Sequence, residues 1–124
     1  MSMQADELFW TSLDRLVAEG QVVVDRPRGS AHPRYPALVY PLDYGYLAGT
    51  VAADGDGVDV WRGTRHGAGV TGVVCTVDLG KRDVELKILL ECTADEARRI
   101  VDMHREGQQS AILLERPAGQ EEQA

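Results

Sequence analysis

The spacing of hydrophobic residues near the N-terminus is that of a helix over residues 6–19 and that of a strand over residues 21–25. Four apolar residues occupy the i, i+4, i+7 and i+8 positions of one helical face: Phe9, Leu13, Leu16 and Val17. This stripe predicts a helix over residues 6–19, within an N-terminal helical segment that comprises residues 1–19. Gly20 is a residue type that often follows the end of a helix. Three consecutive valines then predict a strand over residues 21–25.

The segment from residue 27 to residue 46 follows neither period. It contains prolines at positions 27, 33, 36 and 41. Prolines at this density exclude a helix and favour extended or looping backbone. Four tyrosines also gather here: Tyr35, Tyr40, Tyr44 and Tyr46. Because a tyrosine ring carries a polar hydroxyl, we expect a partly exposed aromatic surface with hydroxyls available.

The second half of the chain alternates strand patterns with turn residues. Apolar and β-branched residues predict three strands, at residues 58–61, 70–79 and 85–92. Thr93 and Glu96 form a capping box, and apolar residues at helical spacing extend the predicted helix to about Glu106. Residues 111–114 predict a short final strand, and the polar residues 117–124 predict a frayed tail.

Short, closely spaced strands with a helix near each end indicate an α+β fold that is mainly β. Such strands suit a small closed or partly closed barrel, with the N-terminal and C-terminal helices packed outside. The length of 124 residues indicates one domain, 1–124, and is enough to bury a core without disulfides.

Charge and composition limit the classes of partner that this protein can have. The formal net charge of −7 opposes a nucleic-acid partner, which needs a basic surface. An acidic protein can still bind phosphates when divalent cations lie between its carboxylates and the substrate. The two cysteines form no metal-binding or redox motif. No apolar run reaches the ~18 residues of a membrane span, and residues 1–7 lack the pattern of a signal peptide. We therefore expect a cytoplasmic protein with neither a nucleic acid nor a membrane as partner.

An acidic loop holds the clearest candidate chemistry. Asp54, Asp56 and Asp59 lie within six residues, and glycines between them allow tight turns. Two carboxylates ~4 Å apart repel by about 1 kcal/mol in water and about 4 kcal/mol at an effective dielectric near 20. Mg²⁺ or Mn²⁺ would offset that repulsion. The alternative is an ordinary Asp-Gly hairpin turn. An EF-hand is excluded, because its sixth and twelfth loop positions hold Asp59 and Arg65.

A second acidic pair, Asp78 and Asp83, flanks the turn between two predicted strands. If these strands form a hairpin, both carboxylates lie at one end of the sheet. Together with the acidic loop they could hold two metal ions ~3.5–4 Å apart, which could activate a water and bind a phosphate oxygen. The alternative is a solvated turn.

The order of these motifs resembles the soluble family I inorganic pyrophosphatases over about residues 20–90. The matching blocks are Val23-Val24-Asp25-Arg26-Pro27, Arg34-Tyr35, Tyr40-Pro41-Leu42-Asp43-Tyr44-Gly45-Tyr46, Asp54-Gly55-Asp56-Gly57-Val58-Asp59-Val60, and Asp78 with Asp83. The resemblance implies a five-stranded, OB-like barrel with flanking helices. It also implies hydrolysis of pyrophosphate to two phosphates with Mg²⁺, or Mn²⁺ in its place, and a homo-oligomer, because family members often form hexamers.

The resemblance also implies a set of metal ligands. Asp54, Asp59 and Asp83 would hold a first metal ion, with Asp59 shared with a second. Asp78 and Asp83 would hold an ion that arrives with the substrate. Asp25 takes the place of a glutamate in the family and is one methylene shorter.

The remaining implied roles concern the water and the substrate. Asp56 would be the general base that deprotonates the attacking water, which bound Mg²⁺ activates. Arg34, in the place of a lysine, and Tyr44 would bind phosphate oxygens. Lys87 and Arg28 are candidates to supply the positive charge that other positions lack.

Several family positions differ in this chain. Pro36 follows Tyr35 where the family has a glutamate, and the segment before Tyr40 is too short to contain the family's phosphate-binding arginine. Glu85 stands in the place of a lysine, Gly57 in the place of a proline, and the C-terminal Tyr-Lys pair has no counterpart. Two alternatives therefore stay open: a hydrolase of another phosphoanhydride or phosphate ester, such as a nucleotide, and an inactive metal- or phosphate-binding relative.

Overall fold

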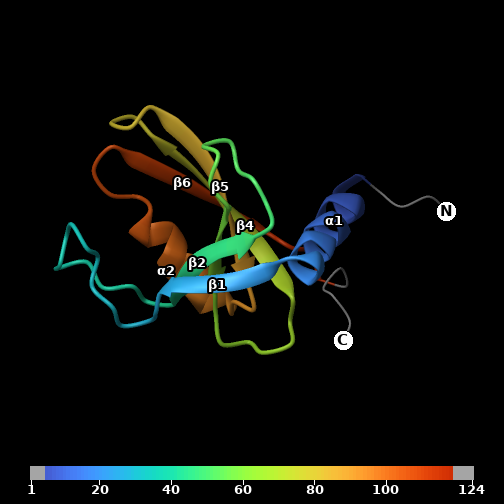
Figure 1. The fold of residues 1–124 in the computed structure, drawn as a ribbon. Coiled ribbons are helices and arrows are strands. Elements are labelled where there is room, and N and C mark those ends of the chain that lie inside the picture. Colours follow the sequence, from blue (N-terminus) through green and yellow to red (C-terminus); the bar gives the residue numbers. More distant parts are fainter. Residues whose placement is uncertain (1–4, 119–124) are drawn as a thin grey trace.

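The computed structural model describes residues 5–118, which form two helices and a six-stranded sheet. In chain order the elements are α1 (Ala5–Glu19), β1 (Gln21–Arg26), β2 (Asp43–Ala48), β3 (Val58–Arg62), β4 (Val70–Asp78), β5 (Asp83–Leu90), α2 (Ala94–Met103) and β6 (Gln109–Glu115). Figure 1 shows α1 on one side of the sheet, and α2 with the loop between β1 and β2 on the other. The predicted α+β class is confirmed.

The strand order β1-β2-β3-β5-β4-β6 places the acidic segments at one end of the sheet. Neighbouring strands are antiparallel except for β3 and β5, which are parallel. The loop that leads into β3 and the turn that leads into β5 therefore lie at the same end. The first contains Asp54 and Asp56, and the second is flanked by Asp78 and Asp83.

The predicted five-stranded barrel is wrong in its strand count and its closure. β1 pairs only with β2 and β6 only with β4, so the described sheet is open and has two edges. The additional strand is β2, which lies in the segment that the prolines marked as extended or looping. Gly45 allows this strand to approach β1, because a Cβ atom there would stand 1.8 Å from the carbonyl oxygen of Val23.

Each face of the sheet packs against one helix. On the α1 face, Trp10 and Leu13 belong to a buried cluster that contains Leu47, Val60 and Ile88. On the α2 face, the buried cluster is made of Trp61, Val74 and Leu89 from the sheet, with Ala97, Ile100 and Val101 from α2. Because side chains alternate between faces, Asp59, Glu85 and Lys87 lie on the α2 face, beyond Trp61 and Leu89.

Across residues 5–118, we find no helix with the length and hydropathy that crossing a membrane requires.

Candidate functional site

The centre of the candidate site is Lys87, whose ammonium group is enclosed by oxygen acceptors. Lys87 and Asp59 are direct partners in the parallel pairing of β3 and β5. The Nζ atom donates to Asp59 Oδ2 at 2.7 Å, to Tyr44 Oη at 2.9 Å and to Glu85 Oε2 at 3.0 Å. The Lys87 side chain is only 5% exposed. An ammonium has three N–H donors, so all of them are used inside the protein.

Electrostatics keep both Lys87 and Tyr44 protonated. Burial alone lowers the pKa of Lys87, but the adjacent Tyr44 and Asp59 outweigh burial and raise it above its ordinary value. Burial also raises the pKa of Tyr44, and the nearby Lys87 only partly opposes this rise. At neutral pH the side chain of Lys87 is therefore a cation, and that of Tyr44 is a neutral phenol.

Aromatic packing holds Tyr44 in this cluster. Its ring centroid lies 4.5 Å from that of Trp61 and 5.7 Å from that of Tyr40. Trp61 Nε1 in turn donates to His104 Nε2 at 3.3 Å. Burial, with a smaller contribution from Lys87, lowers the pKa of His104 to about 4. His104 is therefore neutral at pH 7, which leaves Nε2 free to accept this hydrogen bond.

The turn between β4 and β5 brings the second acidic pair together, as the sequence predicted. Asp78 and Asp83 are direct partners across this hairpin, on the same face as Glu85 and Lys87. Asp78 Oδ1 accepts hydrogen bonds from the backbone nitrogens of Gly80 at 2.9 Å and Lys81 at 3.0 Å. Two carboxylates that lie directly opposite each other destabilise the pairing of the two antiparallel strands, unless a cation lies between them.

The acidic loop forms the Asp-Gly turn that was the alternative to a metal site. Asp54 Oδ1 accepts a hydrogen bond from the backbone nitrogen of Asp56 at 2.9 Å, and Gly55 has a φ of 89°. Asp54 and Asp56 are exposed. Across residues 5–118, no three acidic, histidine or cysteine side chains converge closely enough to hold a metal ion by themselves.

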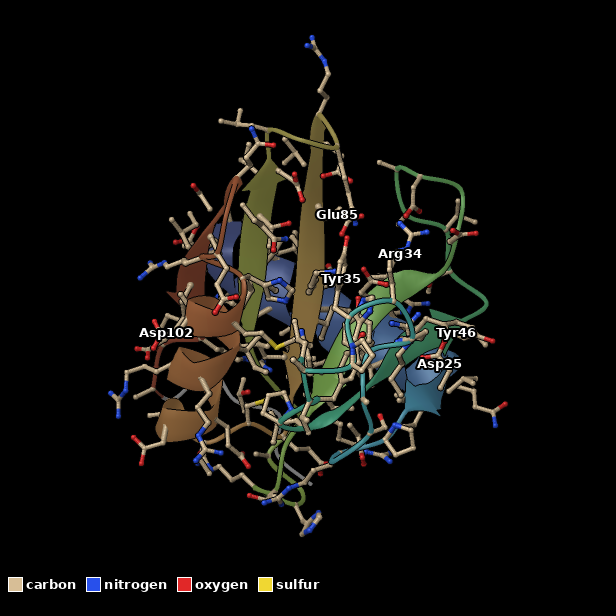
Figure 2. All side chains as sticks on the ribbon, turned by 90° about the vertical axis from the view of Figure 1, so that its left-hand side faces the viewer. Asp25, Arg34, Tyr35, Tyr46, Glu85 and Asp102 are labelled. Atoms are coloured by element: carbon tan, nitrogen blue, oxygen red, sulfur yellow. The ribbon has the colours of Figure 1, made fainter. Side chains whose placement is uncertain are left out.

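The other predicted residues lie around this cluster at different places. Asp25 is exposed at the irregularity where β1 shifts register against β2. Figure 2, which looks onto the α2 side of the sheet, shows Arg34 on the loop in front of the sheet, while Glu85 lies toward the β4–β5 turn. Arg28 is at the opposite end of the sheet from the acidic turns, because its backbone nitrogen bonds Asp43 Oδ1 at the start of β2. The structure therefore separates Arg28 from the carboxylates.

Arg28 instead lines a cavity of about 390 Å³ at that opposite end. Arg62 and His66 also line this cavity, together with the acidic Asp43 and Glu91. Arg62 lies 3.6 Å from Asp43, so part of its charge is already balanced. This mixed lining does not form a purely cationic surface for phosphate.

The donor set fits Mg²⁺ at the β4–β5 turn. Mg²⁺ is usually held by one or two carboxylates, several waters and the phosphates of its substrate, and it seldom has an all-protein cage. Asp78 and Asp83, which are cross-strand partners on one face of the sheet, supply the number of carboxylates that this arrangement needs. At Asp59 and Glu85, in contrast, the cation that the carboxylates contact is the ammonium of Lys87.

Sequence reasoning missed the residues that organise the cluster. Glu85 was recognised as the occupant of a lysine position, but not as an acceptor for Lys87. His104 was assigned no role, since only the folded chain brings it to Trp61. Thr76 was also missed: it is 1% exposed, and its Oγ1 has no hydrogen-bond partner within residues 5–118. The two-residue spacing of Glu85 and Lys87 on a strand was the one available signal.

The sheet, its two helices and the acidic turns at one end define a fold of the inorganic pyrophosphatase type. No protein-family model and no curated protein matches the sequence. Among solved structures, the inorganic pyrophosphatase from Helicobacter pylori is 16% identical, with a TM-score of 0.55 over 76% of this chain and 81% of that chain. The one from Neisseria gonorrhoeae is 21% identical, with a TM-score of 0.54 over 72% of this chain and 77% of that one.

An inorganic pyrophosphatase from Coxiella burnetii has a similar relationship, with 16% identity and a TM-score of 0.54 over 74% of this chain and 81% of that chain. At these identities the similarity establishes the fold. The reaction has to be argued from the residues of this chain.

Proposed function

We propose that this protein hydrolyses inorganic pyrophosphate to two phosphates in a reaction that depends on Mg²⁺. The observation that supports this most is the directly opposed pair of Asp78 and Asp83 at the acidic end of a pyrophosphatase-type sheet. Such a pair is unfavourable alone and favourable with a divalent ion that brings a phosphate.

The metal and the carboxylates have separate tasks in this proposal. When bound, Mg²⁺ supplies charge neutralisation for the phosphates and lowers the pKa of a water. Asp78 and Asp83 hold it at the turn, and Asp54 and Asp25 are further ligands implied by the resemblance, whereas the carboxylate of Asp59 contacts the ammonium of Lys87. Mn²⁺, which also prefers oxygen ligands, is expected to replace it.

The other residues position the substrate and move the proton. Asp56, whose carboxylate is exposed on the acidic loop, accepts the proton of the attacking water. Tyr44 and Arg34 bind phosphate oxygens, and the guanidinium of Arg34 can do so with two parallel hydrogen bonds. Phosphoryl transfer depends chiefly on such positioning and charge stabilisation. The two free cysteines, Cys75 and Cys92, suit the cytoplasmic location that we propose.

Phosphate release measured with pyrophosphate, nucleotides and short polyphosphate, each with Mg²⁺ and with EDTA, tests this proposal. We expect release from pyrophosphate with Mg²⁺ and none with EDTA. Asp83→Asn should lower turnover by about 100-fold, which corresponds to about 2.7 kcal/mol of lost stabilisation. Asp102→Asn, an exposed change on α2, is the matched control and should leave turnover unchanged.

Other outcomes of this experiment would contradict the proposal. Faster release from nucleotides than from pyrophosphate would favour the hydrolase of a larger phosphoanhydride or phosphate ester. This alternative has some support, because Lys87 has no free N–H to offer a phosphate. No release from any substrate would favour the inactive binding relative.

We also propose that the protein is a homo-oligomer that associates through an apolar patch on the α1 face of the sheet. The patch consists of Val77, Val84, Leu86, Ile112 and Leu114 on three adjacent strands, all of them exposed. A contiguous apolar surface of this kind is typical of an interface. We expect Leu86→Lys with Ile112→Lys to give a monomer in analytical ultracentrifugation, whereas Leu8→Lys on α1 should not. A monomeric wild-type protein would contradict this.

A further inference from the structure

The carboxylates at the centre of the site already contact a cation that the protein itself supplies. Asp59 and Glu85 are the acidic groups that contact Lys87 Nζ, at 2.7 Å and 3.0 Å. We propose that the Lys87 ammonium is a built-in cation that takes the place of one divalent ion, so that Asp59 and Glu85 bind no metal. This inference rests on the proposed function only in that it concerns the same site.

The geometry of Lys87 favours a permanent cation over a mobile substrate ligand. Its three N–H donors each have an acceptor, and the side chain is almost fully buried. A phosphate could contact the ammonium only if one of these hydrogen bonds were broken. Removing the ammonium would in turn leave two partly buried carboxylates without a counter-charge, at a substantial cost in stability.

A divalent ion and the ammonium also compete for the same oxygens. Mg²⁺ needs its ligand atoms at 2.0–2.1 Å, as a general property of the ion. Asp59 Oδ2 and Glu85 Oε2 both point at Nζ, so an ion on these atoms would stand beside a positive charge in a poorly solvated place. The two cations therefore exclude each other at these oxygens.

A neighbouring hydroxyl provides a further oxygen donor at this position. Thr76 is the cross-strand partner of Glu85 and lies on the same face of the sheet. Its buried Oγ1 has no hydrogen-bond partner in the described chain, and such groups usually mark the place of a water or an ion. If the ammonium were removed, Asp59, Glu85 and Thr76 would supply oxygen ligands of the type that Mg²⁺ and Mn²⁺ prefer.

The test is the number of Mn²⁺ ions bound per full-length chain, measured without substrate by the loss of the free Mn²⁺ electron paramagnetic resonance signal. We expect Lys87→Met to bind one Mn²⁺ more than the wild type. The double variant Lys87→Met with Asp59→Asn should lose that additional ion. Asp59→Asn in the wild-type background should lose none. Thermal unfolding of each variant shows whether it is folded.

Two results would overturn the inference: a folded Lys87→Met that gains no ion, or an Asp59→Asn variant that binds one ion fewer than the wild type. If Lys87→Met does not fold, Lys87→Gln keeps most of the side-chain volume, and the same gain of one ion is expected. The ion count does not depend on turnover. A gain of one ion in Lys87→Met, together with a wild-type protein that releases no phosphate, would support the inference and contradict the proposed function.

Discussion

Replacing Asp56 with asparagine is expected to lower pyrophosphate turnover by about 10²–10⁴-fold, the usual contribution of a general base. Asparagine has nearly the same shape as aspartate but cannot accept the proton of the attacking water. The Asp56 side chain is exposed, and the backbone of this residue makes two hydrogen bonds: the nitrogen donates to Asp54 Oδ1, and the carbonyl oxygen accepts from the nitrogen of Ala52. The change should therefore leave the fold and the number of bound Mn²⁺ ions unchanged.

Steady-state phosphate release and Mn²⁺ titration, made on the same preparation, check both parts of this prediction. Asp102→Asn is again the control, because it removes an exposed carboxylate from α2, away from the acidic loop. Near-normal turnover in Asp56→Asn would refute the assignment of the base. A loss of bound ions would instead show that Asp56 is a metal ligand.

Hydrophobic periodicity located most of the elements but not their arrangement. It placed α1, α2 and the strands β1 and β3 to β6 within a few residues of their observed bounds. β2 was missed because its strand-forming residues follow a run of prolines, and because its Gly45 reads as a turn residue. That glycine is instead required by the close approach of β1. The parallel pairing of β3 with β5 links strands that are distant in sequence, so no local pattern indicates it.

The site shows the same division between local and long-range information. The placement of Asp78 and Asp83 at one end of the sheet follows from one hairpin, and the sequence predicted it; their direct opposition is a finding of the structure. The turn at Asp54 was also foreseen, as the alternative reading of an Asp-Gly pair. The contact of Lys87 with Asp59 and Tyr44 depends on three strands that come together only in the folded sheet. The sequence could indicate the face on which Lys87 lies, but not that Asp59, Tyr44 and Glu85 would accept from all three of its N–H groups.

Replacing Asp14 with alanine is expected to destabilise the protein by about 3–5 kcal/mol, because it leaves a buried guanidinium without its counter-ion. Arg116 Nη1 and Nη2 each donate to one Asp14 carboxylate oxygen at 2.8 Å, and Nη1 also donates to the carbonyl oxygen of Val70 at 3.1 Å. The Arg116 side chain is 2% exposed and that of Asp14 is 13% exposed. The pair joins α1 to the end of β6, across 102 positions of the sequence.

Urea unfolding of matched variants measures the lost free energy of unfolding. It also distinguishes the effect of this buried ion pair from that of an exposed one. Arg15→Ala breaks an exposed i, i+4 pair with Glu19 on the same helix and should cost no more than about 1 kcal/mol. The double variant Asp14→Leu with Arg116→Met replaces both charges with apolar groups, and it should recover most of the stability that Asp14→Ala loses. A cost for Asp14→Ala as small as that for Arg15→Ala would mean that water reaches Arg116, and that α1 is not held against the sheet by this contact.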